Sequence, residues 1–138
     1  FLGMLPGEVD GIPLRHALEV RHESFMTPEY LQNAREHRVA TVFADTDEHP
    51  SFADVTADFI YARLMRTVST EPTGYAKTAL ATWAMRAGQW ASGEDASNLP
   101  RVQKVARKEG MRDVFMFFIS GAKERAPAAA QHLLTLLA

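Results

Sequence analysis

Four short runs of apolar and β-branched residues recur along the chain, each bounded by polar residues, glycine or proline. Runs of this length with such boundaries are typical of β-strands. Two of them are nearly continuously apolar, as expected where helices cover both faces of a sheet or one face lines a barrel. The predicted strands are His16–Arg21, Val39–Ala44, Phe59–Leu64 and Val114–Ile119.

Helical patterns separate these strands. Thr27 is a suitable N-cap with Pro28 at the first helical position, and the strongest helical periodicity lies in Gly74–Trp90. The predicted helices are Pro28 to about His37, Gly74–Trp90, a short basic helix Arg101–Glu109, and a last helix from about Ala126 onwards. Their buried faces are expected to hold Tyr30, Leu31 and Ala34, then Ala76, Leu80, Trp83, Ala87 and Trp90, and finally Ala130, Leu133, Leu134 and Leu137.

The alternation of strands and helices predicts an α/β fold with a parallel sheet. The link Asp45–Asp58 has no helical period, but it is just long enough for a parallel crossover. The length of 138 residues fits one domain over residues 1–138.

Composition narrows the class of protein. The chain is 46% hydrophobic and 23% charged, as in ordinary globular domains, and its net charge of -2 argues against a strongly electropositive surface for nucleic acid. The absence of cysteine excludes disulfides and thiol chemistry. The opening residues lack the basic region of a signal peptide, and the longest strongly apolar stretch, Val114–Ile119, is too short to cross a bilayer. We therefore expect a cytoplasmic protein without a membrane partner.

Charged residues inside the strands are the strongest functional signal. Because side chains alternate along a strand, Glu19 and Arg21 face away from Leu18 and Val20, which are expected to pack on helices. By the same alternation Phe59, Tyr61 and Arg63 share one face, opposite Ile60, Ala62 and Leu64, while Thr41, Phe43 and Asp45 share a face of the second strand.

A charge buried on such a face needs a partner, which Arg21 or Arg63 could provide for Glu19. Two interpretations remain open. The charges either form an ion-pair network that fills the interior, or they ring a site at the carboxyl ends of parallel strands.

Two further groups could carry chemistry. His22 has the side-chain type of a general acid or base near neutral pH, although a surface or helix-facing histidine with an ordinary hydrogen bond fits better. Asp45, Asp47 and His49 alternate in the loop after the second strand and are weak candidates for a divalent metal. The alternative for this loop is a solvated acidic segment, and no other cofactor is indicated.

Two basic regions are candidates for anion recognition. The loops Arg66–Ser69 and Gly121–Lys123 follow the third and fourth strands and could hold a phosphate, but they contain no glycine-rich phosphate motif. The alternative is that both are solvated loops. A second basic face, on the short predicted helix, fits a solvated outer helix better than a nucleic-acid surface, given the acidic total charge. Its residues are Arg101, Lys104, Arg107 and Lys108.

Several segments resemble, in order, those of the YecE-like family of unknown function. They are Arg15–Phe25, Val39–Asp45, Ala57–Leu64, Gly74–Tyr75 followed by Leu80, Trp83 and Trp90, and the closing helix that starts at Ala126–Pro127. The resemblance implies a TIM-type (β/α)8 barrel, of which only the C-terminal half, strands five to eight, would be present. Phe1–Pro6 would then end the helix before strand five. The missing N-terminal half or a second copy of the chain would be needed to close the barrel.

The chain departs from the family pattern at the predicted site. Phe115 and Phe117 stand where the family has tyrosines, and Ile119 and Ser120 stand at its polar positions. Met65 and Arg66 replace the usual histidine and glycine. These changes remove hydrogen-bonding groups from the place where the family's chemistry would be expected.

Two functional hypotheses follow. The first is a barrel enzyme of hydrolytic or proton-transfer type that acts on a small polar or anionic ligand. The second is a non-catalytic binding or scaffold domain that completes its barrel with another chain or copy. In the first, the catalytic candidates are Glu19 as acid or base, Arg21 and Arg63 for negative charge, Asp45 as second carboxylate and His22 as proton shuttle. The candidate ligand-binding residues are Tyr61, Arg66, Ser120 and Lys123.

Overall fold

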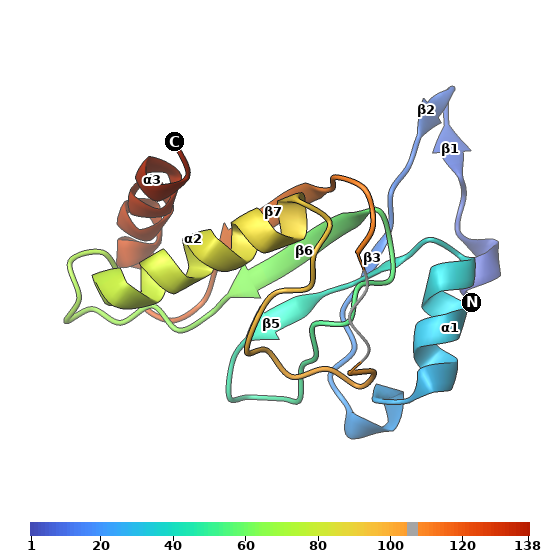
Figure 1. Cartoon of the computed structure of the whole chain (residues 1–138), viewed down its shortest axis with the longest axis horizontal. Helices are drawn as coiled ribbons and strands as arrows, with labels where there is room; N and C mark the ends of the chain where they lie inside the picture. Colours follow the sequence, from blue (N-terminus) through green and yellow to red (C-terminus); the bar gives the residue numbers. More distant parts are fainter. Residues whose placement is uncertain (105–107) are drawn as a thin grey trace.

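The computed structural model describes residues 1–104 and 108–138. Parallel strands form its centre, as the alternating pattern predicts (Figure 1). The main sheet has the order β5 (Phe43–Asp45), β6 (Phe59–Leu64) and β7 (Asp113–Phe118), all parallel. A second parallel pair joins β3 (Ala17–Leu18) to β4 (Ala40–Thr41). The predicted α/β class is confirmed.

In the described residues, three α-helices accompany the strands: α1 (Pro28–Glu36), α2 (Lys77–Ala91) and α3 (Ala126–Leu137). Thr27 caps α1 as predicted, because its side chain accepts a hydrogen bond from the Tyr30 amide at 3.2 Å. Short 3₁₀ turns are η1 (Leu2–Met4), η2 (Glu23–Phe25) and η3 (Lys123–Arg125). In Figure 1 α2 runs along the main sheet, and α1 lies near β3.

The larger core lies between the main sheet and α2. Ile60, Ala62 and Leu64 of β6 are buried against α2, as the alternation predicts, and all four of the buried α2 residues belong to the predicted face. These are Leu80, Trp83, Ala87 and Trp90. A smaller core joins Val20 to Leu31 of α1 and to Phe52. Helices therefore cover one face of the sheet, which leaves its other face for the site.

Two predicted strands differ from the observed ones. The run Val39–Ala44 is interrupted at Val42, because β4 pairs with β3 whereas β5 pairs with β6. The predicted strand His16–Arg21 is reduced to β3, since its ladder partner β4 has only two residues. Phe59–Leu64 has its predicted bounds, and the last strand starts one residue early, at Asp113.

The predicted helix end, Phe1–Pro6, contains the 3₁₀ turn η1, and a hairpin follows it. The antiparallel strands β1 (Glu8–Val9) and β2 (Ile12–Pro13) project from the body in Figure 1. Asp10 and Gly11 join them with φ values of 51° and 76°. Aspartate and glycine are the residue types that a two-residue turn with positive φ at both positions prefers.

Two helical predictions are wrong in part. Residues 101–104 and 108–109 are not helical, so the predicted basic helix Arg101–Glu109 does not form there; residues 105–107 lie outside the described residues. On α3 the buried residues are Ala129 and Leu133, whereas Leu134 and Leu137 are 66% and 46% exposed. The helix packs mainly against α2 and β7, so a narrow stripe of it is covered.

Candidate functional site

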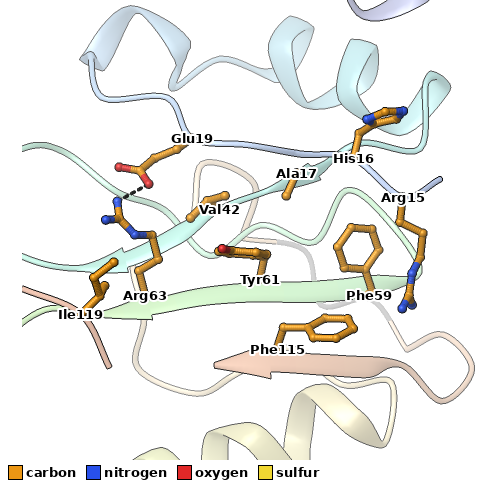
Figure 2. A pocket seen from close by; sticks show the side chains of 10 residues that line it. All are labelled: Arg15, His16, Ala17, Glu19, Val42, Phe59, Tyr61, Arg63, Phe115 and Ile119. Atoms are coloured by element: carbon orange, nitrogen blue, oxygen red, sulfur yellow. Dashed lines mark hydrogen bonds and ion pairs between the residues drawn. The ribbon is translucent and has the colours of Figure 1, made fainter. Parts of the chain in front are cut away.

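The uncovered face of the sheet forms an open cleft of about 870 Å³ (Figure 2). Its floor comes from β6, where Phe59, Tyr61 and Arg63 point to the same side, as their alternation predicts. Tyr61 is half-buried and stacks on Phe117 of β7, with ring centroids 4.9 Å apart. The remaining lining residues are Arg15, His16, Ala17, Glu19, Val42, Phe115 and Ile119.

Glu19 and Arg63 meet at one end of this cleft. Val20 is buried against α1, so its neighbour Glu19 is turned to the opposite side, toward β6. There the Glu19 carboxylate accepts a hydrogen bond from Arg63 Nη1 and another from Arg21 Nε, the latter at 2.7 Å. The side chains of Glu19 and Arg63 are each 17% exposed. The predicted pairing of these charges is confirmed.

The two arginines decide the ionisation state of Glu19. Burial on its own raises the pKa of the Glu19 carboxyl, but the hydrogen bonds and charges of Arg63 and Arg21 outweigh burial. The net result is a pKa below the ordinary value of 4.5, so Glu19 is ionised at neutral pH. An ionised carboxylate can accept a proton or a hydrogen bond, but it cannot act as a general acid.

Asp45 belongs to a second polar cluster, on the helix side of the sheet. It shares a face with Thr41 and Phe43, which contact Tyr30 of α1 and Trp83 of α2. The Tyr75 hydroxyl donates to Asp45 Oδ2 at 2.9 Å, and Arg66 Nε donates to Asp45 Oδ1 at 2.8 Å. Asp45 is thus not among the lining residues of the cleft.

Arg66 forms hydrogen bonds to both carboxylates of this second cluster. Its two Nη atoms donate to the Asp47 carboxylate at 2.5 and 2.9 Å, and these bonds raise the pKa of Arg66 further. Burial raises the pKa of Tyr75 well above its ordinary 10.0, so the hydroxyl stays protonated and can donate to Asp45. Arg66, predicted as an anion-binding residue, is therefore engaged by two carboxylates of its own chain.

The loop after β5 brings an unexpected histidine next to Glu19. His49 Nε2 lies 3.6 Å from Glu19 Oε1, and its side chain is only 9% exposed. His22, the predicted proton shuttle, is exposed instead and caps η2, where its Nδ1 accepts a hydrogen bond from the Ser24 amide at 3.2 Å. Sequence reasoning selected the histidine next to Arg21, but the fold places the one from the following loop beside Glu19.

The three weak metal candidates do not come together as one ligand set. Asp45 and Asp47 share Arg66, and His49 faces Glu19. Within residues 1–104 and 108–138, no group of three or more histidine, aspartate or glutamate side chains has an arrangement that could hold a metal ion.

The remaining predicted ligand-binding residues lie beyond the last strand. Ser120 has a φ of 63°, and its carbonyl accepts a hydrogen bond from the buried Thr67 hydroxyl at 3.1 Å. Lys123 is exposed in η3. The hydrogen bond between Thr67 and Ser120 joins the loop that follows β6 to the loop that follows β7.

The basic residues near position 101 have acidic neighbours. Arg101 pairs with Asp95 at 2.6 Å, Lys108 lies 3.8 Å from Glu94, and Lys104 is exposed. Arg107 lies outside the described residues. Two of the four cations are thus neutralised locally, which is typical of a solvated surface.

The fold and the cleft define a class: a parallel α/β protein with ionised side chains at one end of its strands. Within that class the chain belongs to the DUF72 family, described as a protein of unknown function, whose profile matches residues 1–138. The YecE-like resemblance fits this family. No curated protein is detectably similar to the chain.

A solved structure of a DUF72 family protein from Enterococcus faecalis V583 is similar to this chain, with a TM-score of 0.58 and 17% sequence identity. The match covers 90% of this chain and 49% of the other, so the chain spans about half the length of that protein. At this identity the likeness shows a shared fold. In the part of the chain that the structure describes, no helix is both long and apolar enough to cross a membrane.

Proposed function

We propose that the protein binds a small anionic ligand in the cleft, through Arg63 and Arg21, at the carboxyl ends of strands that belong to a TIM-type barrel. The parallel strands, the helices on one face and the DUF72 neighbour of twice the length support the barrel. Sites in such barrels lie where the strands end, and Arg63 is the second-last residue of β6.

The observation that carries this proposal is the incomplete bonding of Arg63. A guanidinium has five N–H donors. Among the described residues, only the bond from Nη1 to Glu19 uses them. Because Arg63 lines the cleft and is anchored by Glu19, the remaining donors are available to the oxygens of a carboxylate or phosphate.

Glu19 has two roles in this proposal. It fixes the Arg63 guanidinium, and its ionised carboxylate can accept a proton from a bound ligand. A hydrolytic or proton-transfer enzyme would use Glu19 as general base and the two arginines to stabilise negative charge. Asp45 and His22 have no part in it, because the first lies on the helix side and the second caps η2.

The barrel proposal also requires a partner. One edge of β7 is unpaired among the described strands, and Phe115, Phe117 and Ile119 are 37–43% exposed on the cleft face. The first half of the barrel, or a second copy of this chain, would pair with that edge and cover these side chains.

The binding proposal is tested by titrating the protein with sulfate, phosphate and small carboxylates in a calorimeter. We expect saturable binding of at least one anion, weakened about tenfold or more in Arg63→Gln, because a charged hydrogen bond contributes about 1.5–3 kcal/mol. Arg15→Gln is the matched control, since Arg15 pairs with Asp113 at the opposite end of the cleft. Binding that is insensitive to Arg63, or absent for every anion, would contradict the proposal.

A further inference from the structure

His49 has a buried nitrogen with no partner. Its Nε2 has essentially no contact with solvent and makes no hydrogen bond within the described residues. The nearest charged atom is Glu19 Oε1 at 3.6 Å, which is longer than a hydrogen bond. A buried polar atom without a partner is unfavourable, so its presence next to the anion site calls for a physical reason.

The other ring nitrogen identifies the tautomer. His49 Nδ1 lies 3.0 Å from the Pro50 carbonyl oxygen. A carbonyl oxygen only accepts hydrogen bonds, so Nδ1 carries the hydrogen of the neutral ring. Nε2 is then a bare acceptor that faces an ionised carboxylate, which is also only an acceptor. One proton on Nε2 would give both groups a partner.

The charges around Glu19 show what this proton would do. With neutral His49, the cluster of Glu19, Arg63 and Arg21 has a net charge of +1, and protonation of His49 raises the net charge of the four groups to +2. The acidic neighbours of His49 on its own loop do not cancel this charge. Asp47 binds Arg66, and Glu48 is exposed. A second positive charge strengthens the attraction for an anion that binds at Arg63.

We propose that the cleft takes up its anion together with one proton, which His49 Nε2 accepts and shares with Glu19. This rests on the anion site proposed above. The ligand class is the conjugate base of a weak acid, a carboxylate or a phosphate ester, because such a ligand and the proton together make up the free acid. Coupling of this kind is reciprocal: proton uptake strengthens anion binding, and anion binding promotes proton uptake.

Sulfate is the probe, since it stays a dianion throughout the pH range of the experiment and cannot carry the proton itself. Calorimetric titrations at pH 6.5 in two buffers with different ionisation enthalpies measure the protons taken up with the anion. We expect net uptake of a substantial fraction of one proton by the wild-type protein. Affinity for sulfate should be about tenfold higher at pH 5.5 than at pH 8, within the usual range of coupling between sites.

His49→Asn tests the assignment, because its amide can still donate to the Pro50 carbonyl while Nε2 is removed. It should bind sulfate without proton uptake and with little pH dependence. His22→Asn is the matched control, since asparagine is a good helix cap, and it should behave as the wild type. Uptake lost in His22→Asn rather than in His49→Asn would overturn the assignment.

Two outcomes separate this inference from the proposed function. Sulfate binding with no proton uptake in the wild-type protein would overturn the coupling and leave the anion site intact. If neither sulfate nor phosphate nor a small carboxylate binds at all, the anion site itself is wrong, and the coupling is wrong with it. The pH dependence is measured on the wild-type protein, so the result does not depend on whether a variant folds.

Discussion

Replacement of Glu19 by glutamine tests how the charged cluster contributes to stability. The substitution keeps the size and shape of the side chain but removes its charge. Arg63, whose side chain is 17% exposed, would then have no carboxylate within reach among its described contacts. A mostly buried cation that has lost its counterion is unfavourable, because the protein interior solvates it less well than water does.

The expected loss of unfolding free energy follows from the two hydrogen bonds that Glu19 accepts, from Arg63 and from Arg21. A bond between charged groups contributes about 1.5–3 kcal/mol when it is shielded from water, as the Arg63 bond is. The Arg21 bond contributes about 0–1 kcal/mol, because Arg21 is 62% exposed. The amide oxygen of glutamine can still accept one neutral bond. We therefore expect Glu19→Gln to lower the free energy of unfolding by about 2 kcal/mol at pH 7.

The contribution of Glu19 to the stability of the folded protein should decrease at acidic pH. The pKa of Glu19 is lowered in the folded protein, so its contribution is fully present above its unfolded value of 4.5. That contribution is lost as the pH falls through the lower folded pKa, because the carboxyl then binds a proton. The stability difference between wild type and Glu19→Gln should be present at pH 7 and become smaller below pH 4.5.

Urea unfolding followed by circular dichroism at pH 7 and pH 3.5 measures this difference. Glu23→Gln is the control, since Glu23 is exposed in η2 and its replacement should change stability by less than about 0.5 kcal/mol. A Glu19→Gln variant as stable as the wild type at pH 7 would refute the reasoning. So would a difference that persists undiminished at pH 3.5.

Four further substitutions should alter the free energy of urea unfolding. Gly121→Ala should destabilise by more than about 1 kcal/mol, because φ is +58° and a Cβ would lie 2.5 Å from the Thr67 carbonyl oxygen. Gly88→Ala, whose Cβ would have open space within the C-terminal part of α2, should stabilise by about 0.5–1 kcal/mol. Trp90→Ala should cost about 3–5 kcal/mol, because Trp90 is 1% exposed in the core. Thr27→Ala should cost about 0.5–2 kcal/mol through loss of the α1 cap. The opposite sign in any of the four would contradict its local explanation.

Elements with strong local signals could be predicted from the sequence. The bounds of β6 and the buried face of α2 follow from periodicity alone, because each packs one continuous face against the other. The lengths of β3 and β4 could not be predicted, since they depend on how far each finds a backbone partner. The hairpin turn at Asp10 and Gly11 has a clear local signal, but no strand was predicted on either side of it.

Part of the candidate site could likewise be predicted from the sequence, and part could not. The pairing of Glu19 with Arg63 follows from strand alternation and from the requirement that a buried charge has a counterion. His49 could not be placed, because the loop that carries it has no periodicity to indicate its path. Asp45 shares a face with Thr41 and Phe43 as predicted, but that face is the helix side, where Tyr75 and Arg66 bind Asp45. Asp45 is therefore not the second carboxylate beside Glu19 that was predicted.

The order of strands in the main sheet has a consequence for the speed of folding. Ala62 of β6 pairs with Met116 of β7, 54 positions later, whereas Phe43 of β5 pairs with Ala62 across only 19. Contacts between distant parts of a chain form slowly, because a long loop must close before they become favourable. The β5–β6 pair should therefore form first, with β7 joining it after α2 has packed. Until then one edge of β6 stays open, and β7 joins as the last strand of the sheet.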